Sequence, residues 1–127
     1  VADVSGHDLG SSLATSALKA LLRQNMTLLY PPADGLLTVN SILRGVISEE
    51  KYLTLLYLRL NRMSKIATIV NAGHPPLIVL PTTGLATAIY GSGDVIGMYE
   101  HIEIETIEIP IKKGDRLFMF SDGFIEN

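Results

Sequence analysis

The first eight residues constrain the fold of this chain most strongly. Val1-Ala2-Asp3-Val4 is a strand-like run that contains one acid, and Ser5-Gly6-His7-Asp8 predicts a tight turn into a helix. A strand fixes its carboxylate, a glycine lets the backbone approach an ion, and a helix N-terminus offers free N–H groups. The pattern therefore predicts a metal or phosphate site on a strand–turn–helix unit.

The composition limits the kinds of protein that this chain can be. Its 127 residues are 47% hydrophobic, which suits one compact domain with a core, and its net charge of −3 includes no sizeable basic patch that would favour nucleic acid. There is no cysteine, which excludes disulfides and thiol catalysis. No apolar run reaches the roughly 18 residues of a membrane span, and no signal peptide is evident, so we expect a cytoplasmic protein.

Both ends of the chain indicate a piece of a longer protein. Val1 already lies in the strand-like run, and Asn127 follows Ser121-Asp122-Gly123 closely with no closing element between them. Natural domains usually end in polar, loosely held residues. We therefore expect a single domain, residues 1–127, that is truncated at both ends. Open sheet edges would favour a homodimer in concentrated solution.

Two helices follow the opening turn. Apolar residues recur every three to four positions over 9–26, with Asp8, Ser11 and Ser12 as available N-caps, and a pair of prolines stops this helix. A second helix is predicted from an Asp34 cap to about Ser48. Its expected buried side consists of Leu36, Leu37, Val39, Ile42, Leu43, Val46 and Ile47.

The remainder of the chain predicts an antiparallel sheet. Runs rich in β-branched, aromatic and leucine residues alternate with turns that contain glycine, proline or asparagine. The expected strands are 52–60, 65–70, 77–80, 85–90, 102–109 and 116–120, with a hairpin turn at 61–64 and a further turn at 112–115. A strand, two helices and a run of strands favour the α+β class, with the helices layered on a sheet.

A second acid occurs in the same local setting as Asp3. Asp122 stands in Ser121-Asp122-Gly123, where the last expected strand meets a turn. Carboxylates at strand ends, with a nearby backbone carbonyl, are hard oxygen ligands that suit Mg²⁺ or Mn²⁺. Two plainer interpretations stay open, because Asp-Gly is a common turn dipeptide and Asp3 could be a buried acid that caps the helix.

Three blocks of the sequence resemble one family. They are Val-Ala-Asp-Val-Ser-Gly-His at 1–7, Asn-Ala-Gly-His-Pro-Pro at 71–76, and Gly-Asp-Arg-Leu-Phe-Met-Phe-Ser-Asp-Gly-Phe-Ile-Glu at 114–126. In order and spacing they are similar to the bacterial SpoIIE/RsbU-type branch of the PPM (type 2C) metal-dependent serine/threonine phosphatases. The resemblance implies a layered α/β/β/α sandwich, here incomplete, with a two-metal centre of Mn²⁺ or Mg²⁺.

The resemblance also assigns the site. Asp3 would match the acid that bridges both cations, the backbone carbonyl of Val4 the adjacent metal ligand, and Asp122 an acid of the second metal. The implied reaction removes phosphate from a phosphoserine or phosphothreonine of a regulatory protein, such as an anti-sigma-factor antagonist in bacterial stress signalling. A sensor or receiver domain would lie N-terminal in the longer chain.

Some features favour a different function. Asp8 stands where the family usually has glycine, and the family's further acids lie upstream and downstream of the stretch present here. Two carboxylates and one carbonyl are few ligands for two cations that each prefer about six oxygens. The alternative is a degenerate phosphatase-like domain that binds a partner without catalysis.

Other polar residues have plainer expected roles. We expect His7 and His74 to form structural hydrogen bonds rather than to bind metal. Glu126 could approach the site from the turn after Asp122. The acids of the expected strand 102–109 and its approach should form a solvated face; they are Glu100, Glu103, Glu105 and Glu108.

Overall fold

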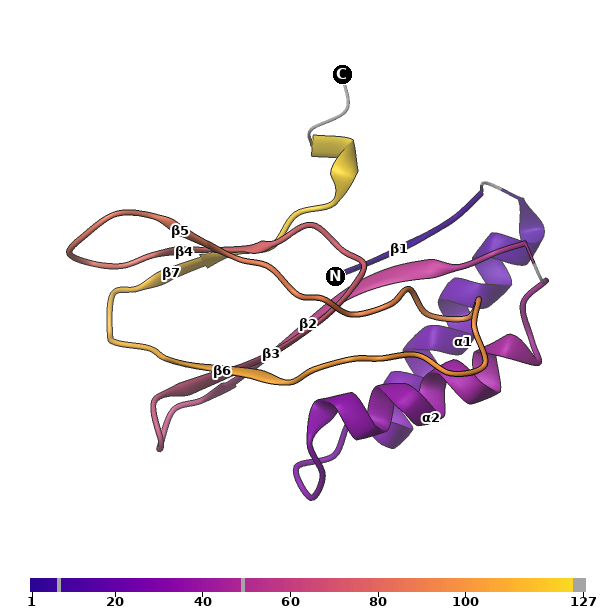
Figure 1. Ribbon diagram of the computed structural model, residues 1–127, viewed down its shortest axis with the longest axis horizontal. Coiled ribbons are helices and arrows are strands. Elements are labelled where there is room, and N and C mark those ends of the chain that lie inside the picture. Colours follow the sequence, from indigo (N-terminus) through magenta and orange to yellow (C-terminus); the bar gives the residue numbers. More distant parts are fainter. Residues whose placement is uncertain (7, 49, 125–127) are drawn as a thin grey trace.

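The computed structural model describes residues 1–6, 8–48 and 50–124 (Figure 1). Among these residues, no helix is both long and apolar enough to cross a membrane. The elements in chain order are β1 (Ala2–Val4), α1 (Leu9–Asn25), α2 (Pro32–Arg44), β2 (Leu53–Asn61), β3 (Ile66–Ala72), β4 (Leu77–Leu80), β5 (Thr87–Ile89), β6 (Ile107–Pro110), β7 (Arg116–Phe118) and a 3₁₀ turn (Asp122–Phe124).

The strands form two antiparallel sheets. One has the order β1-β2-β3-β6 and the other β5-β4-β7. Figure 1 shows α1 and α2 together on one side of the four-stranded sheet, with the three-stranded sheet on its other side. This arrangement confirms the α+β class and gives three layers of the expected sandwich: helices, sheet and sheet.

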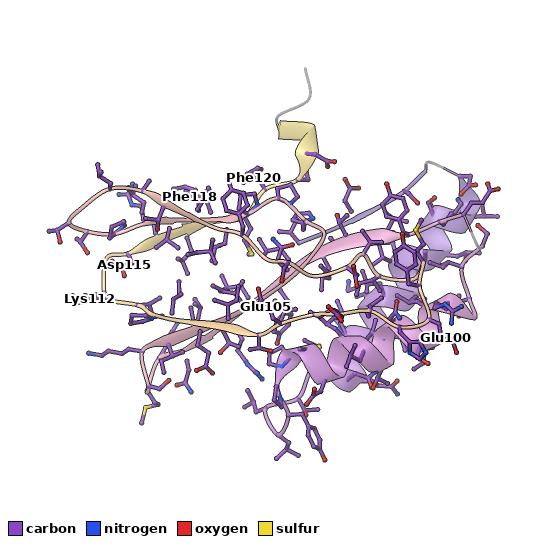
Figure 2. The ribbon with its side chains drawn as sticks, in the orientation of Figure 1. Glu100, Glu105, Lys112, Asp115, Phe118 and Phe120 are labelled. Carbon is purple, nitrogen blue, oxygen red and sulfur yellow. The ribbon has the colours of Figure 1, made fainter. Side chains whose placement is uncertain are left out.

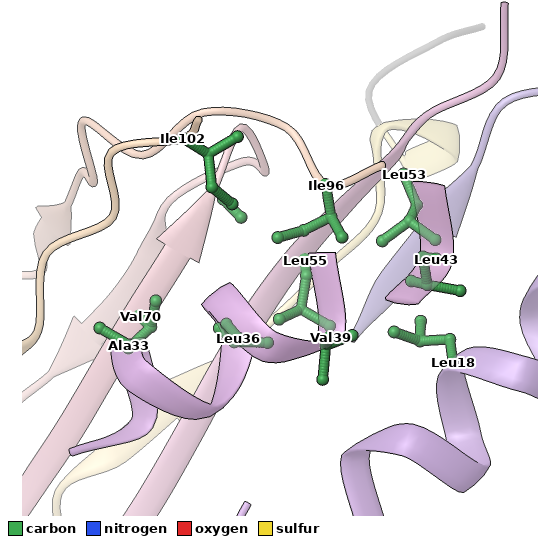
Figure 3. Packing of buried hydrophobic residues seen from close by; sticks show 11 residues of the cluster. Leu18, Ala33, Leu36, Val39, Leu43, Leu53, Leu55, Val70, Ile96 and Ile102 are labelled. Carbon is green, nitrogen blue, oxygen red and sulfur yellow. The ribbon is translucent and has the colours of Figure 1, made fainter. Parts of the chain in front are cut away.

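The first core lies between the helices and the four-stranded sheet. Leu36, Val39 and Leu43 of α2 are fully buried against Leu53 and Leu55 of β2, as the close view in Figure 3 shows. Leu18 joins them from α1. Leucine and valine repeat at helical spacing on α2, and leucine recurs at alternate positions on β2, so one face of each element is removed from water.

The second core lies between the two sheets. Leu56 of β2, Ile69 of β3 and Leu77 of β4 are fully buried there. Leu55 and Leu56 are adjacent in sequence but belong to different cores, because successive side chains of a strand point to opposite faces. The four-stranded sheet is therefore covered on both faces, which explains the nearly continuous apolar sequence of β2 and β3.

The second helix differs from the expected one at both ends. It begins at Pro32 after an N-cap at Pro31 that makes no side-chain hydrogen bond, so Asp34 lies in the first turn and is not the cap. The helix ends at Arg44 instead of near Ser48, with Gly45 as its C-cap, in accord with the low helix propensity of glycine. Three residues expected to be buried are exposed: Leu37, Ile42 and Val46.

The prediction of a long strand over 102–109 is wrong for the first half of that segment. Only Ile107–Pro110 pairs with β3, and the preceding segment is irregular. Asp94 and Glu103 hydrogen-bond to each other there, and Ile96 and Ile102 are buried in the helix-side core. Tertiary burial has therefore overridden the alternating pattern. The four acids Glu100, Glu103, Glu105 and Glu108 are exposed, as expected, although only Glu108 lies in a strand.

Candidate functional site

Asp3 lies on the edge strand β1, which pairs with β2 so that Asp3 stands opposite Thr54. The next residue, Val4, packs into the helix-side core. Alternation along the strand then directs the Asp3 side chain to the opposite face, toward the three-stranded sheet. The apolar residues around Asp3 thus determine which way its carboxylate points.

Asp122 reaches the same place from the other sheet. Strand β7 ends at Phe118, and the chain continues through Phe120 into the 3₁₀ turn that begins with Asp122. Figure 2 shows Phe118 and Phe120 along the stretch that leads to this turn, with Lys112 and Asp115 at the tight turn before β7. The expected turn at 112–115 is confirmed, because the Asp115 carboxylate accepts a hydrogen bond from the Lys112 N–H at 2.8 Å.

The two acids meet in a small open pocket of about 140 Å³. Its lining is Asp3, Val4, Ser5, Tyr52, Thr54 and Asp122. A hydrogen bond between the two carboxyl groups is the largest cause that raises the pKa of Asp3, followed by burial and by repulsion from Asp122. The backbone N–H of Val4 bonds to the Asp3 carboxylate and opposes this rise.

His74 lies directly behind the acidic pair and is buried. Its Nδ1 is 2.9 Å from the hydroxyl of Thr54, and its Nε2 is 3.0 Å from the carbonyl oxygen of Phe120. Burial is the main cause that lowers the pKa of His74, partly offset by the Phe120 carbonyl and the two acids. The expected hydrogen-bonding role of this histidine is therefore what the structure shows.

The turn that follows β1 is held by a second polar group. The Asp8 carboxylate caps α1 by accepting the Ser11 N–H at 2.9 Å, and it forms an ion pair with Lys51. The Ser11 hydroxyl donates to the carbonyl of Ser5 at 3.0 Å. Asp8 is thus a helix cap, one of the roles expected for it, and its ion pair joins the start of α1 to the approach to β2.

The acidic pair fits a divalent cation. Two exposed carboxylates in contact repel each other when both are charged, and a hard cation would relieve this repulsion with oxygen ligands of the type it prefers. Val4 adds a backbone carbonyl at the same pocket. Over residues 1–6, 8–48 and 50–124, however, no group of three or more acids or histidines is arranged so that it could hold a metal ion.

Some residues of interest were not found from the sequence, and others lie outside the described part. Thr54 and Lys51 were not singled out, because only the strand register and the path of the chain before β2 bring them to Asp3 and Asp8. His7 and Glu126 lie outside the described residues. A larger pocket, of about 470 Å³, lies at the far end of the β2–β3 hairpin, and neither Asp3 nor Asp122 lines it.

The layered fold is that of the PPM-type phosphatases, and the sequence places the chain in their SpoIIE/RsbU branch. Residues 1–127 match the family described as Stage II sporulation protein E (SpoIIE). The chain belongs to this family, as its three sequence blocks indicated.

Known relatives agree with this assignment. The phosphoserine phosphatase RsbP of Bacillus subtilis is 25% identical over 99% of this chain, which spans 32% of RsbP. The solved RsbU and RsbW domains of Rv1364c from Mycobacterium tuberculosis match 98% of this chain and 35% of that one, with a TM-score of 0.79 and 22% identity. RsbX, solved in complex with magnesium, matches 91% of this chain and 55% of its own, with a TM-score of 0.70 and 14% identity. The chain thus spans about a third of RsbP. The structures of the Rv1364c domains and of RsbX have the same fold as this chain.

Proposed function

We propose that this chain forms the acidic centre of a Mn²⁺- or Mg²⁺-dependent phosphatase that acts on phosphoserine or phosphothreonine in a regulatory protein. The observation that carries the proposal is that Asp3 of β1 and Asp122 of the turn after β7 line one pocket, where their carboxyl groups interact. RsbP is named a phosphoserine phosphatase, and RsbX was solved with magnesium, which supports the same chemistry here.

The roles of the residues follow from their positions. Asp3 and Asp122 would hold the cation with their carboxylates, and the backbone carbonyl of Val4 would add a third oxygen. The Val4 N–H lowers the pKa of Asp3 and so favours the charged carboxylate that a cation requires. A divalent ion in such a site neutralises phosphate charge and lowers the pKa of a water that can attack phosphorus. This reaction requires no nucleophilic side chain, in accord with a sequence that has no cysteine.

The proposed biological setting rests on the family. The substrate would be a small phosphorylated regulator, such as an anti-sigma-factor antagonist, and the longer chain would carry a sensor or receiver domain on the N-terminal side. Cytoplasmic location and homodimer formation stay predictions from the sequence. Light scattering on concentrated protein tests the dimer, and a monodisperse monomer would contradict it.

A second candidate function is a partner-binding domain without catalysis. It is favoured by the small number of metal-binding side chains that the described residues bring together. Asp8 in place of the family's usual glycine points the same way from the sequence.

Mn²⁺ calorimetry on the 127-residue chain, followed by binding and hydrolysis measurements on the full-length protein, distinguishes the two candidates. We expect binding that Asp3→Ala and Asp122→Ala each abolish, because each removes one of two carboxylates. Glu103→Gln is the control, since the Glu103 side chain is exposed away from the pocket and only its backbone N–H and carbonyl bond to Asp94. Hydrolysis of a phosphoserine peptide by the full-length protein is then expected to require the same two acids. Absence of both Mn²⁺ binding and hydrolysis in the full-length protein would support the partner-binding domain instead.

A further inference from the structure

The turn at 71–76 carries the one sequence block that the proposed reaction does not use. We infer that His74, on this turn, is a positioning residue that holds the Asp122 segment against the sheet that carries Asp3. The inference rests on the proposed function, because it assigns His74 the task of setting the distance between the two acids.

The first contact of His74 is with the strand beside Asp3. Thr54 is the cross-strand partner of Asp3, and its hydroxyl lies 2.9 Å from His74 Nδ1. Directly opposite residues of an antiparallel pair have Cβ atoms about 5 Å apart. The imidazole is therefore attached to the four-stranded sheet at the position of Asp3.

The second contact of His74 is with the segment that carries Asp122. The Phe120 carbonyl oxygen, two residues before Asp122, lies 3.0 Å from His74 Nε2. A carbonyl can only accept a hydrogen bond, so Nε2 donates. In the neutral ring Nδ1 is then an acceptor, and the Thr54 hydroxyl is its donor. One tautomer of one side chain thus satisfies both contacts and joins the two sheets.

The backbone of His74 is itself fixed by Asn71. The buried Asn71 side chain accepts the His74 N–H at 2.8 Å and donates to the His74 carbonyl at 2.9 Å. Gly73 has φ +67, and a Cβ there would lie 2.7 Å from the Val95 side chain. The imidazole is therefore presented by a turn with little freedom to move.

A fixed link of this kind matters for a metal site. Mn²⁺ or Mg²⁺ requires its oxygen ligands at closely defined distances, and residues that orient the ligands commonly change metal affinity about 10- to 100-fold when removed. Asp3 belongs to one sheet and Asp122 follows the last strand of the other, so their separation depends on contacts between these two parts of the chain. Among the hydrogen bonds described, those of His74 span that gap beside both acids.

The first test measures Mn²⁺ affinity by calorimetry on the 127-residue chain. We expect Thr54→Val to weaken Mn²⁺ binding about fivefold or more and His74→Ala about tenfold or more, because each breaks the link without removing a ligand. Thr54→Ser keeps the hydroxyl and should restore the affinity. Thr68→Val is the matched control, since Thr68 lies in the same sheet but lines the pocket at the other end of the hairpin. Unchanged affinity in both Thr54→Val and His74→Ala would overturn the inference.

The second test needs no metal. Backbone ¹⁵N relaxation should give Ser121 and Asp122 the order parameters of a rigid backbone, about 0.85, in the unaltered chain. We expect these values to fall in Thr54→Val and His74→Ala but to stay high in Thr54→Ser and Thr68→Val. A ¹⁵N spectrum of the imidazole should also show the neutral form with its proton on Nε2.

The two tests separate failure of the inference from failure of the proposed function. If neither the unaltered chain nor Asp3→Ala binds Mn²⁺, the proposed metal site fails in this chain, and the relaxation measurement alone then decides the role of His74. If Ser121 and Asp122 are equally ordered in all variants, or already mobile in the unaltered chain, His74 does not position this segment.

Discussion

At the scale of single residues, the site depends on polar groups with more than one partner. Asp8 is the clearest example, since it caps α1 and pairs with Lys51 at the same time. The Lys51 partner, followed by the Ser11 N–H and hydroxyl, lowers the pKa of Asp8 to about 2. An acid whose pKa is lower in the folded than in the unfolded state stabilises the fold only while it is ionised.

The consequence is a defined dependence of stability on pH. Asp8→Asn should lower the free energy of unfolding near neutral pH, because the cap and the ion pair lose the charge. The stabilisation is fully present above the ordinary pKa of 3.8 and is lost as the pH falls through about 2, so the difference between the two proteins should close in this range. Chemical denaturation at several pH values measures this difference in the free energy of unfolding.

Lys51→Met provides the control for this prediction. It removes the largest cause of the pKa shift, so the pH-dependent part of the Asp8→Asn effect should shrink in that background. A difference in stability between the unaltered chain and the Asp8→Asn variant that is equal at neutral pH and at a pH of about 2 would contradict the account.

At the scale of elements, the two helices approach closely enough to require a glycine. Gly35 of α2 lies against the end of α1, and a Cβ there would be 2.6 Å from the Asn25 carbonyl oxygen and 2.9 Å from the Met26 sulfur. A contact this short with backbone cannot be relieved by a rotamer change. The close pair presents a continuous apolar surface to the four-stranded sheet, on which β1 and Asp3 lie.

Substitution of this glycine should separate the helices. Gly35→Ala is expected to destabilise the fold by about 1–3 kcal/mol, although alanine is otherwise the better helix former. Gly45→Ala is the matched control, because its added Cβ would lie at an ordinary contact distance of 3.5 Å from the Ile42 carbonyl oxygen, and its backbone is right-handed. That variant should be neutral or slightly more stable. Urea unfolding of both measures the contrast, and equal destabilisation would show that close packing is not the cause.

At the scale of the whole molecule, the site exists because two sheets are packed face to face. Asp3 is carried by the four-stranded sheet, and Asp122 follows the last strand of the three-stranded sheet. Leu56, Ile69 and Leu77 fill the space between these sheets and are fully buried. The inter-sheet core therefore sets the relation between the two acids as well as the stability of the fold.

Removal of side-chain volume from this core should affect both properties. Leu56→Ala is expected to destabilise the protein by about 2–5 kcal/mol and to weaken Mn²⁺ binding where the chain stays folded. Leu60→Ala is the control on the same strand, since Leu60 is 52% exposed, and its effect should stay within about 0.5 kcal/mol. Thermal unfolding measures the stability of both variants, and calorimetry measures their Mn²⁺ binding. A loss of stability in Leu56→Ala as small as that in Leu60→Ala would contradict the role of this core.

Local patterns predicted the elements best where one rule acts without competition. The helix expected over 9–26 is found at Leu9–Asn25 with Asp8 as its cap, and the strand expected at 77–80 is found unchanged. The prediction failed where distant residues decide. The segment before Ile107 alternates like a strand, but Ile102 is buried in the helix-side core. The loop that precedes it is fixed to α2, because the Asn40 side chain accepts the N–H of Gly97 and donates to the carbonyl of Tyr99.

The sequence by itself determined the family, the class of fold and the identity of the two acids as candidates, because these follow from short motifs and from hydrophobic periodicity. The tertiary structure alone decided that Asp3 and Asp122 share a pocket, that Thr54 stands beside Asp3, and that His74 bonds to both sides. These relations join residues that are far apart in the chain, because they depend on strand register and on the packing of the two sheets. Neither is encoded in the local pattern of any one segment.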